Sequence, residues 1–63
     1  MKVKSLRLTT DFVYEDFEVE CRDKYELIEK IVENKMLHLV DLDDNKEYYV
    51  NGKYVSEFEL EEE

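Results

Sequence analysis

Four oxygen-bearing side chains stand at alternate positions of one polar segment, at the spacing that opens an EF-hand calcium loop. They are Asp41, Asp43, Asn45 and Glu47. A calcium loop of this kind also needs a glycine at its sixth position and a bidentate glutamate at its twelfth. The chain has Lys46 and Gly52 at those places. We therefore predict an ordinary polar turn here and no metal site.

His38 is the only histidine, and it lies in the middle of an apolar segment. A catalytic histidine needs a nucleophile or a carboxylate held beside it, and the sequence shows no serine, cysteine or acid at a diagnostic spacing. With Gly52 as the only glycine, there is also no glycine-rich loop to hold a phosphate group. We therefore expect a structural or surface histidine, no catalytic residues, no cofactor and no small-molecule substrate. The protein is not expected to be an enzyme.

Aromatic residues gather toward the end of the chain. They are Tyr48, Tyr49, Tyr54 and Phe58. A two-faced hairpin turns some of its rings away from its own core, and exposed tyrosines are favoured at protein interfaces because they bring contact area at a low entropic cost. Aromatic pairing inside one small sheet is the alternative explanation. The three tyrosines are our first candidates for binding a partner.

A stretch without any basic residue carries acids that would point outward from a strand. They are Asp11, Glu15, Asp16, Glu18 and Glu20. Alternate residues of a strand are about 7 Å apart, so carboxylates at that spacing imitate a phosphate backbone. An acidic decoy would use them to occupy a basic nucleic-acid-binding protein, although a solvated strand face is the ordinary explanation. Glu18 and Glu20 are therefore our second set of candidate partner-binding residues.

Charge is distributed unevenly along the chain. Residues 1–10 carry three basic residues and no acid, whereas residues 11–63 carry all 18 acids against six basic residues; the sums are +3 and −12, and the net charge is −9. A phosphate backbone or an anionic membrane would meet this negative charge, so we expect neither nucleic acid nor a membrane as a direct partner. The expected partner is another protein or a second copy of the chain, which would make a homo-oligomer.

Cysteine content and hydropathy bear on the compartment. The single cysteine, Cys21, excludes an intramolecular disulfide and fits a reducing compartment; it is predicted to be a small apolar residue on a strand. No stretch approaches the roughly 20 apolar residues of a membrane span, and none has the pattern of a signal peptide. We expect a cytoplasmic location. The small size without an enzymatic motif suits a phage or mobile-element accessory protein.

The 63 residues leave room for one domain, spanning residues 1–63 and ending in a frayed acidic tail. Its predicted strands cover residues 5–9, 17–22, 36–42 and 47–50, with a polar turn at residues 43–46. The apolar residues switch from one set of alternate positions to the other between Tyr14 and Phe17. A bulge or turn is therefore predicted at that point, so that both halves keep their apolar face inward.

Residues 23–34 fit two structures. As a helix, they begin with Asp23 as the N-cap and place an apolar stripe along one side. The stripe consists of Leu27, Ile28, Ile31 and Val32. As a strand, they place Tyr25, Leu27 and Ile31 on one face and Ile28 and Val32 on the other. The sequence leaves both structures open.

The Asn51–Gly52 pair is the strongest two-residue hairpin signal, because both central positions of a type I′ turn need a positive φ. In such a hairpin Tyr49 would face Tyr54. The alternative is a short 3₁₀ turn over residues 52–55 that leads into a last strand at residues 56–60.

Together these patterns predict a small all-β, or mainly β, domain that forms a five-stranded meander or an SH3-like barrel. The alternative is an α+β domain with one helix at residues 23–34. For function we predict a non-enzymatic protein-interaction module that self-associates or binds a protein partner through an edge strand and exposed tyrosines. The alternative is an acidic decoy or inhibitor, a nucleic-acid mimic that binds a basic nucleic-acid-binding protein.

Overall fold

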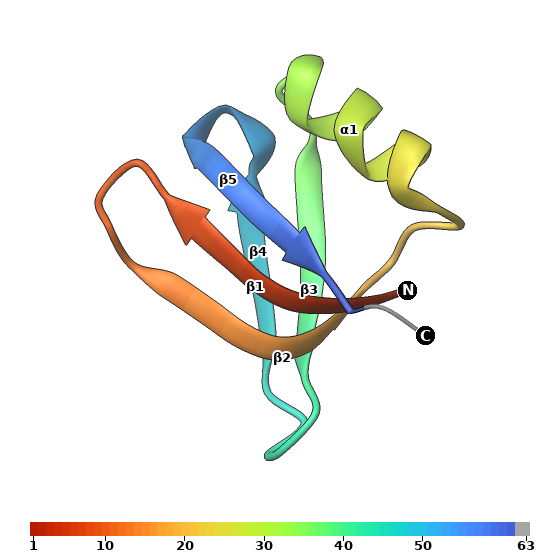
Figure 1. Ribbon diagram of the computed structural model, residues 1–63, viewed down its shortest axis with the longest axis vertical. Helices are drawn as coiled ribbons and strands as arrows, with labels where there is room; N and C mark the ends of the chain where they lie inside the picture. Colours follow the sequence, from red (N-terminus) through yellow and green to blue (C-terminus); the bar gives the residue numbers. More distant parts are fainter. Residues whose placement is uncertain (62–63) are drawn as a thin grey trace.

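The computed structural model describes residues 1–61. Within them the chain forms five strands, one α-helix and one 3₁₀ turn, in an order that can be followed in Figure 1. The elements are β1 (Lys2–Leu8), β2 (Val13–Val19), α1 (Lys24–Val32), β3 (Met36–Asp41), β4 (Glu47–Asn51), η1 (Gly52–Tyr54) and β5 (Val55–Leu60). The prediction of a small, mainly β domain with five strands is confirmed.

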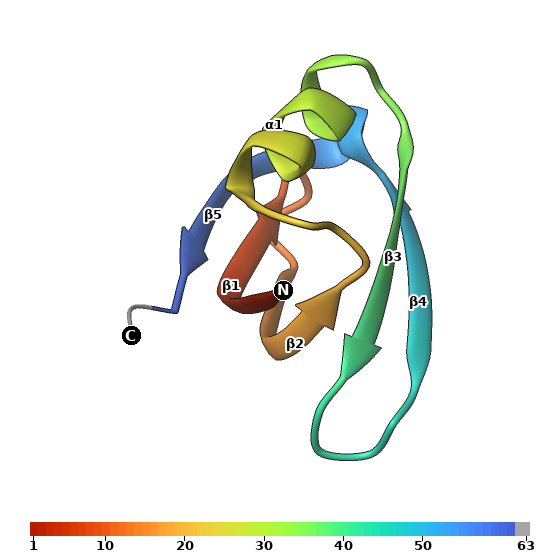
Figure 2. The same cartoon turned by 90° about the vertical axis from the view of Figure 1, so that its right-hand side faces the viewer.

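The five strands make one antiparallel sheet in the order β4-β3-β2-β1-β5. The first four strands form a meander, and the last returns to pair with β1. The sheet is strongly bent, so that β3 and β4 lie opposite β1 and β5, and α1 crosses one end of the space between them (Figures 1 and 2). This curled sheet corresponds to the meander or barrel-like arrangement that the sequence predicts.

The core fills the inside of the bent sheet. Its buried side chains are Val3, Leu6, Phe17, Val19, Leu27, Leu37, Leu39 and Val50. Seven of these eight come from strands, at positions that alternate with exposed ones on β2 and β3, and Leu27 comes from α1. Burying one face of a strand and exposing the other produces the two-residue period seen in the sequence.

Residues 24–32 are helical, so the strand alternative for residues 23–34 is wrong. The Asp23 carboxylate caps the helix by accepting a hydrogen bond of 3.0 Å from the Glu26 N–H. The predicted apolar stripe is divided, because Leu27 is fully buried whereas Ile28 and Val32 are 42% and 73% exposed. The helix therefore uses only one side of its apolar surface to close the core.

The predicted change of parity in β2 lies at Asp16, whose φ of 49° is in the left-handed region. Phe17 is buried on one side of this residue and Tyr14 is partly buried on the other. The ladder with β1 is interrupted at the same point, because its pairs run from Val3 with Phe17 directly to Ser5 with Glu15. A kink at Asp16 thus keeps both halves of β2 turned toward the core.

The type I′ hairpin predicted at Asn51–Gly52 is wrong, and the 3₁₀ alternative is confirmed. Asn51 has φ −75° and ψ 132°, and its side chain caps η1 by accepting a hydrogen bond of 3.0 Å from the Lys53 N–H. Gly52 is required for a different reason: a Cβ at this residue would lie 2.6 Å from the Ile31 Cα. The close packing of η1 against α1 therefore selects the glycine, and Tyr49 does not face Tyr54.

The turn between β3 and β4 uses its own carboxylates to bind backbone amides. The Asp41 side chain accepts from the Asp43 N–H at 2.8 Å, and the Asp44 side chain accepts from the Lys46 N–H at 3.0 Å. Such bonds are typical of a polar turn. The frayed tail was predicted for residues 61–63; residues 62 and 63 lie outside the described part of the chain.

Candidate functional site

The hydrogen bonds of β3 determine which way the backbone of β4 points. The Asp41 N–H donates to the Lys46 C=O at 2.9 Å, and the Gly52 N–H donates to the Lys35 C=O at 2.8 Å. Both bonds join residues that stand directly opposite each other in the β3–β4 register. In an antiparallel ladder, such hydrogen-bonded pairs alternate with pairs that make no bond to each other.

The same alternation sets the direction of the backbone N–H and C=O groups between these two bonds. The backbone N–H and C=O groups of Tyr48 and Val50 point toward β3, because these residues form hydrogen-bonded pairs with Leu39 and Leu37. The N–H and C=O groups of the remaining β4 residues point away from β3. These residues are Glu47, Tyr49 and Asn51. Within residues 1–61, β4 ends the sheet and has no strand on this side. We call this row of outward backbone groups the β4 edge.

A row of three side chains crosses the outer face of the sheet beside the β4 edge. Glu20 directly follows β2, His38 lies opposite it on β3, and Tyr49 lies opposite His38 on β4. The His38 and Tyr49 rings are stacked, with centroids 4.8 Å apart and an angle of 9° between the planes. Tyr49 remains 66% exposed, so the ring is held in place while its outer face stays open.

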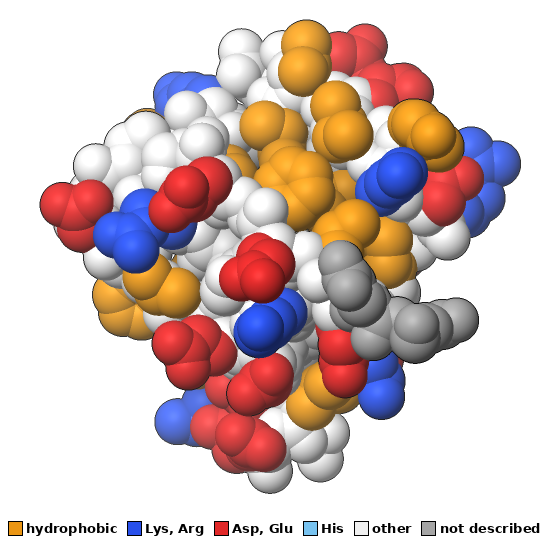
Figure 3. Space-filling model, in the orientation of Figure 1, with side chains coloured by type: hydrophobic (Ala, Val, Ile, Leu, Met, Phe, Trp, Pro, Cys, Tyr) orange, Lys and Arg blue, Asp and Glu red, His pale blue; other side chains and the backbone are white. Residues whose placement is uncertain are grey.

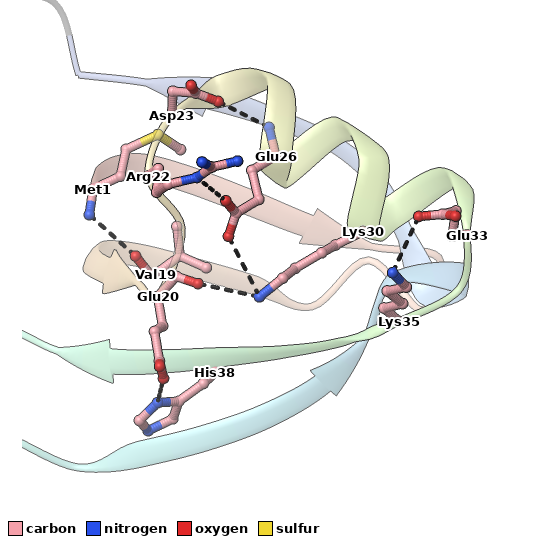
Figure 4. Close-up of polar contacts among 10 residues, drawn as sticks. All are labelled: Met1, Val19, Glu20, Arg22, Asp23, Glu26, Lys30, Glu33, Lys35 and His38. Atoms are coloured by element: carbon pink, nitrogen blue, oxygen red, sulfur yellow. Dashed lines mark hydrogen bonds and ion pairs between the residues drawn. The ribbon is translucent and has the colours of Figure 1, made fainter.

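His38 joins two carboxylates through its two ring nitrogens. Its Nδ1 lies 2.9 Å from the Glu20 Oε2, and its Nε2 lies 2.8 Å from the Glu47 Oε1. Figure 4 shows the Glu20 side of this arrangement. A neutral imidazole has only one N–H, so both bonds form only when the ring is protonated. The hydrogen bonds to Glu20 and Glu47 raise the pKa of His38, and the bond to His38 lowers the pKa of Glu20.

The structure divides the predicted partner-binding residues between several places. Tyr49 and Glu20 belong to the row beside the β4 edge. Glu18 lies on the same outer face of β2, and its carboxylate is 3.6 Å from the N-terminal amino group. Tyr48 faces inward and is partly buried, with its ring 5.3 Å from that of Tyr14. Tyr54 is exposed on η1, which follows β4.

Part of this surface was not predicted from the sequence. Met36 is 55% exposed on the outer face of β3, two residues before His38. The alternation of Met36 and His38 with the buried Leu37 and Leu39 was the signal that could have identified both as outward residues. In the sequence, Glu47 stands out only as the last acid of the incomplete calcium-loop pattern.

A second exposed apolar surface lies on α1. Its side chains are Tyr25, Ile28 and Val32, which recur at helical spacing. Figure 3 shows hydrophobic side chains gathered over α1 and the neighbouring part of β5. The helical interpretation of residues 23–34 was the signal for this stripe.

The chemistry of the other reactive groups is limited. Burial raises the pKa of the Cys21 thiol, so it stays protonated at neutral pH and is a poor nucleophile. The Arg22 Nε forms an ion pair of 2.7 Å with the Glu26 carboxylate, and the Lys30 Nζ donates a hydrogen bond of 3.2 Å to the Glu20 C=O (Figure 4). Within residues 1–61, no three His, Cys, Asp or Glu side chains are grouped to hold a metal ion. In the same residues, no helix is long and apolar enough to cross a membrane.

Comparison of the chain with protein-family models, with curated proteins and with solved structures found no match.

Proposed function

We propose that the protein is a non-enzymatic interaction module that binds an extended segment of a partner by strand addition at the β4 edge. The observation that carries this proposal is the alternation of outward backbone groups at Glu47, Tyr49 and Asn51 beside an exposed, pre-positioned Tyr49 ring. An added strand satisfies the outward N–H and C=O groups, and the side chains between them provide selectivity.

The sequence of β4 supports this use of the edge. Edge strands are commonly protected by lysine, by proline or by a bulge. β4 contains no lysine or proline, and its register with β3 is continuous from Met36 with Asn51 to Val40 with Glu47. The edge is therefore regular enough to accept another strand.

The chemistry of the partner follows from the side chains beside the edge. Side chains directly opposite each other on neighbouring strands interact, so Glu47 favours a basic residue on the added strand and Tyr49 favours an apolar or aromatic one. The net charge of −9 also accelerates the approach of a basic partner. We propose a cationic, extended protein segment as the ligand. A cytoplasmic partner fits the single reduced cysteine.

A second copy of the chain is the homo-oligomeric version of the same proposal. Two β4 strands paired antiparallel about Tyr49 would place each Glu47 opposite Asn51 of the other copy. This register avoids a direct contact between like charges and pairs the outward N–H groups of both edges.

The acidic decoy is the second candidate. The net charge of −9 and the exposed Glu18 carboxylate support it. Glu20 supports it less, because its carboxylate is already bonded to His38.

A pull-down from host cells with mass spectrometry, repeated with variants, tests the proposal. Partners bound by strand addition should be lost with Tyr49→Ala and retained with Glu18→Gln. Partners lost with Glu18→Gln and with salt, but retained with Tyr49→Ala, would support the decoy instead. Partners that respond to neither variant would contradict both proposals.

A further inference from the structure

One imidazole ties three strands together on the outer face of the sheet. His38 extends from β3 and binds Glu20 after β2 and Glu47 at the start of β4, at 2.9 and 2.8 Å. Each ring nitrogen faces a carboxylate oxygen, and an ionised carboxylate only accepts hydrogen bonds. Both contacts are therefore attractive only while both ring nitrogens carry a proton.

We propose that His38 is a proton-controlled clamp on the edge strand: the imidazolium locks β4 to β2 across β3, and loss of its proton releases one carboxylate and loosens β4. After deprotonation one ring nitrogen presents a lone pair to a carboxylate, so that contact becomes repulsive. The clamp lies within one chain, so it can be tested without a partner and stands independently of the proposed function.

The charged groups around the ring are consistent with this behaviour. Glu20 and Glu47 are the carboxylates that contact it, and the uncharged Tyr49 ring covers one of its faces. Lys30 of α1 reaches the Glu20 backbone C=O and not the ring. Glu18, on the same outer face of β2, is turned toward the N-terminal amino group. The two contacting carboxylates raise the pKa of His38 above its ordinary value of about 6.5, so the protonated, closed form of the clamp is the majority at that pH.

The position of the clamp explains why β4 should respond. β4 has five residues and, among residues 1–61, a strand on one side only. Glu47 is its first residue and directly follows the polar turn, so the clamp adds a side-chain contact at the end of β4 next to the bond from the Asp41 N–H to the Lys46 C=O. Releasing Glu47 should therefore loosen the inward hydrogen bonds at Tyr48 and Val50 first.

Nuclear magnetic resonance of the ¹⁵N-labelled protein tests both halves of the proposal. The ring nitrogen shifts of His38 should show a mostly protonated imidazolium at pH 6 and a midpoint above about 6.5. Protection factors for the Tyr48 and Val50 amides should fall several-fold as the pH passes this midpoint, relative to the amide of Leu6 in the core. Glu20→Gln and Glu47→Gln should each lower the midpoint.

Glu18→Gln is the matched control, because it removes a carboxylate from the same face without touching the ring. It should shift the midpoint less than either clamp variant. His38→Gln should remove the pH-dependent change in protection. A midpoint at or below about 6.5, a midpoint insensitive to both clamp variants, or unchanged protection of Tyr48 and Val50 would overturn the proposal.

Discussion

The ring of Tyr49 lies flat against the imidazole of His38, with centroids 4.8 Å apart and planes 9° from parallel. The two residues form a pair without mutual backbone hydrogen bonds, the kind in which side chains of neighbouring strands approach most closely. The stack restricts the Tyr49 ring before any partner arrives. A partner that covers this ring consequently loses less side-chain entropy on binding.

Replacing Tyr49 should weaken partner binding far more than replacing the other exposed tyrosine. Tyr49→Ala removes the restrained ring beside the β4 edge and should cost about 1–2 kcal/mol or more in binding. Tyr54→Ala removes a ring on η1, beyond the last residue of the β4 edge, and should change the affinity less. Isothermal titration calorimetry with the captured partner measures both. An equal or larger loss with Tyr54→Ala would place the contact elsewhere.

Stability should depend on pH in a direction set by the His38 clamp. The pKa of His38 is raised in the folded state, so its stabilising contribution is complete below about 6.5 and is lost as the pH rises through the folded pKa. The pKa of Glu20 is lowered, so its contribution is present above about 4.3 and is lost as the pH falls through the folded pKa.

Thermal unfolding followed across this pH range checks both signs. His38→Gln should remove the loss of stability on the alkaline side, whereas Glu18→Gln should preserve it. A wild-type melting temperature that rises as the pH increases above about 6.5 would contradict the assigned direction for His38.

Gly52→Ala should destabilise the protein because of the packing between η1 and α1. The added Cβ would meet the Ile31 Cα at 2.6 Å and the Lys30 carbonyl oxygen at 2.7 Å, and both are backbone atoms that cannot rotate away. We expect a loss of about 1–3 kcal/mol in the free energy of unfolding. The neighbouring exposed Lys53→Ala should cost less than about 0.5 kcal/mol. Urea denaturation that shows equal stability for the two variants would disprove the close contact.

Two adjacent residues of α1 should respond very differently to truncation. Leu27 is fully buried, so Leu27→Ala should cost about 2–5 kcal/mol of unfolding free energy. Ile28 is 42% exposed and alanine is a better helix former, so Ile28→Ala should change stability by less than about 1 kcal/mol. Urea denaturation of both variants gives the comparison. Similar losses would mean that α1 packs on the core through a different side.

Much of the sheet could be predicted because its strands bury one face only. Phe17 and Val19 alternate with exposed acids, and this period identifies β2 from sequence alone. Residues 23–34 were ambiguous because Ile28 and Val32 are apolar but exposed, so the helix lacks a clean polar side. The hairpin prediction at Gly52 was wrong because the glycine is required by contact with Ile31, a residue distant in sequence.

The candidate site could be predicted only in part. Glu20 was predicted to face outward from the alternation of its strand, whereas Tyr49 was a candidate by residue type only, together with Tyr48 and Tyr54. The clamp was not predicted. Glu20 is 18 positions before His38 in the sequence and Glu47 is 9 positions after it, and only the registers of β2 and β4 against β3 bring the three residues together. The inward position of Tyr48 also depends on register, since either tyrosine of the pair could face the core.

The most direct test of strand addition removes one outward N–H from the β4 edge. The φ of Asn51 is −75°, within the range of proline, and its N–H points away from β3, so Asn51→Pro should leave the sheet intact. Asn51→Ala loses the same side-chain bond to the Lys53 N–H but retains the backbone N–H, which makes it the matched control.

The measurement is the affinity of the two variants for the captured partner, or for a second copy of the chain, by isothermal titration or dilution calorimetry. Circular dichroism establishes beforehand that both variants are folded. Strand addition at the β4 edge predicts that Asn51→Pro binds about tenfold more weakly than Asn51→Ala, because one intermolecular hydrogen bond is lost and the partner's C=O is left unpaired. Equal affinities of the two folded variants would contradict strand addition at this edge.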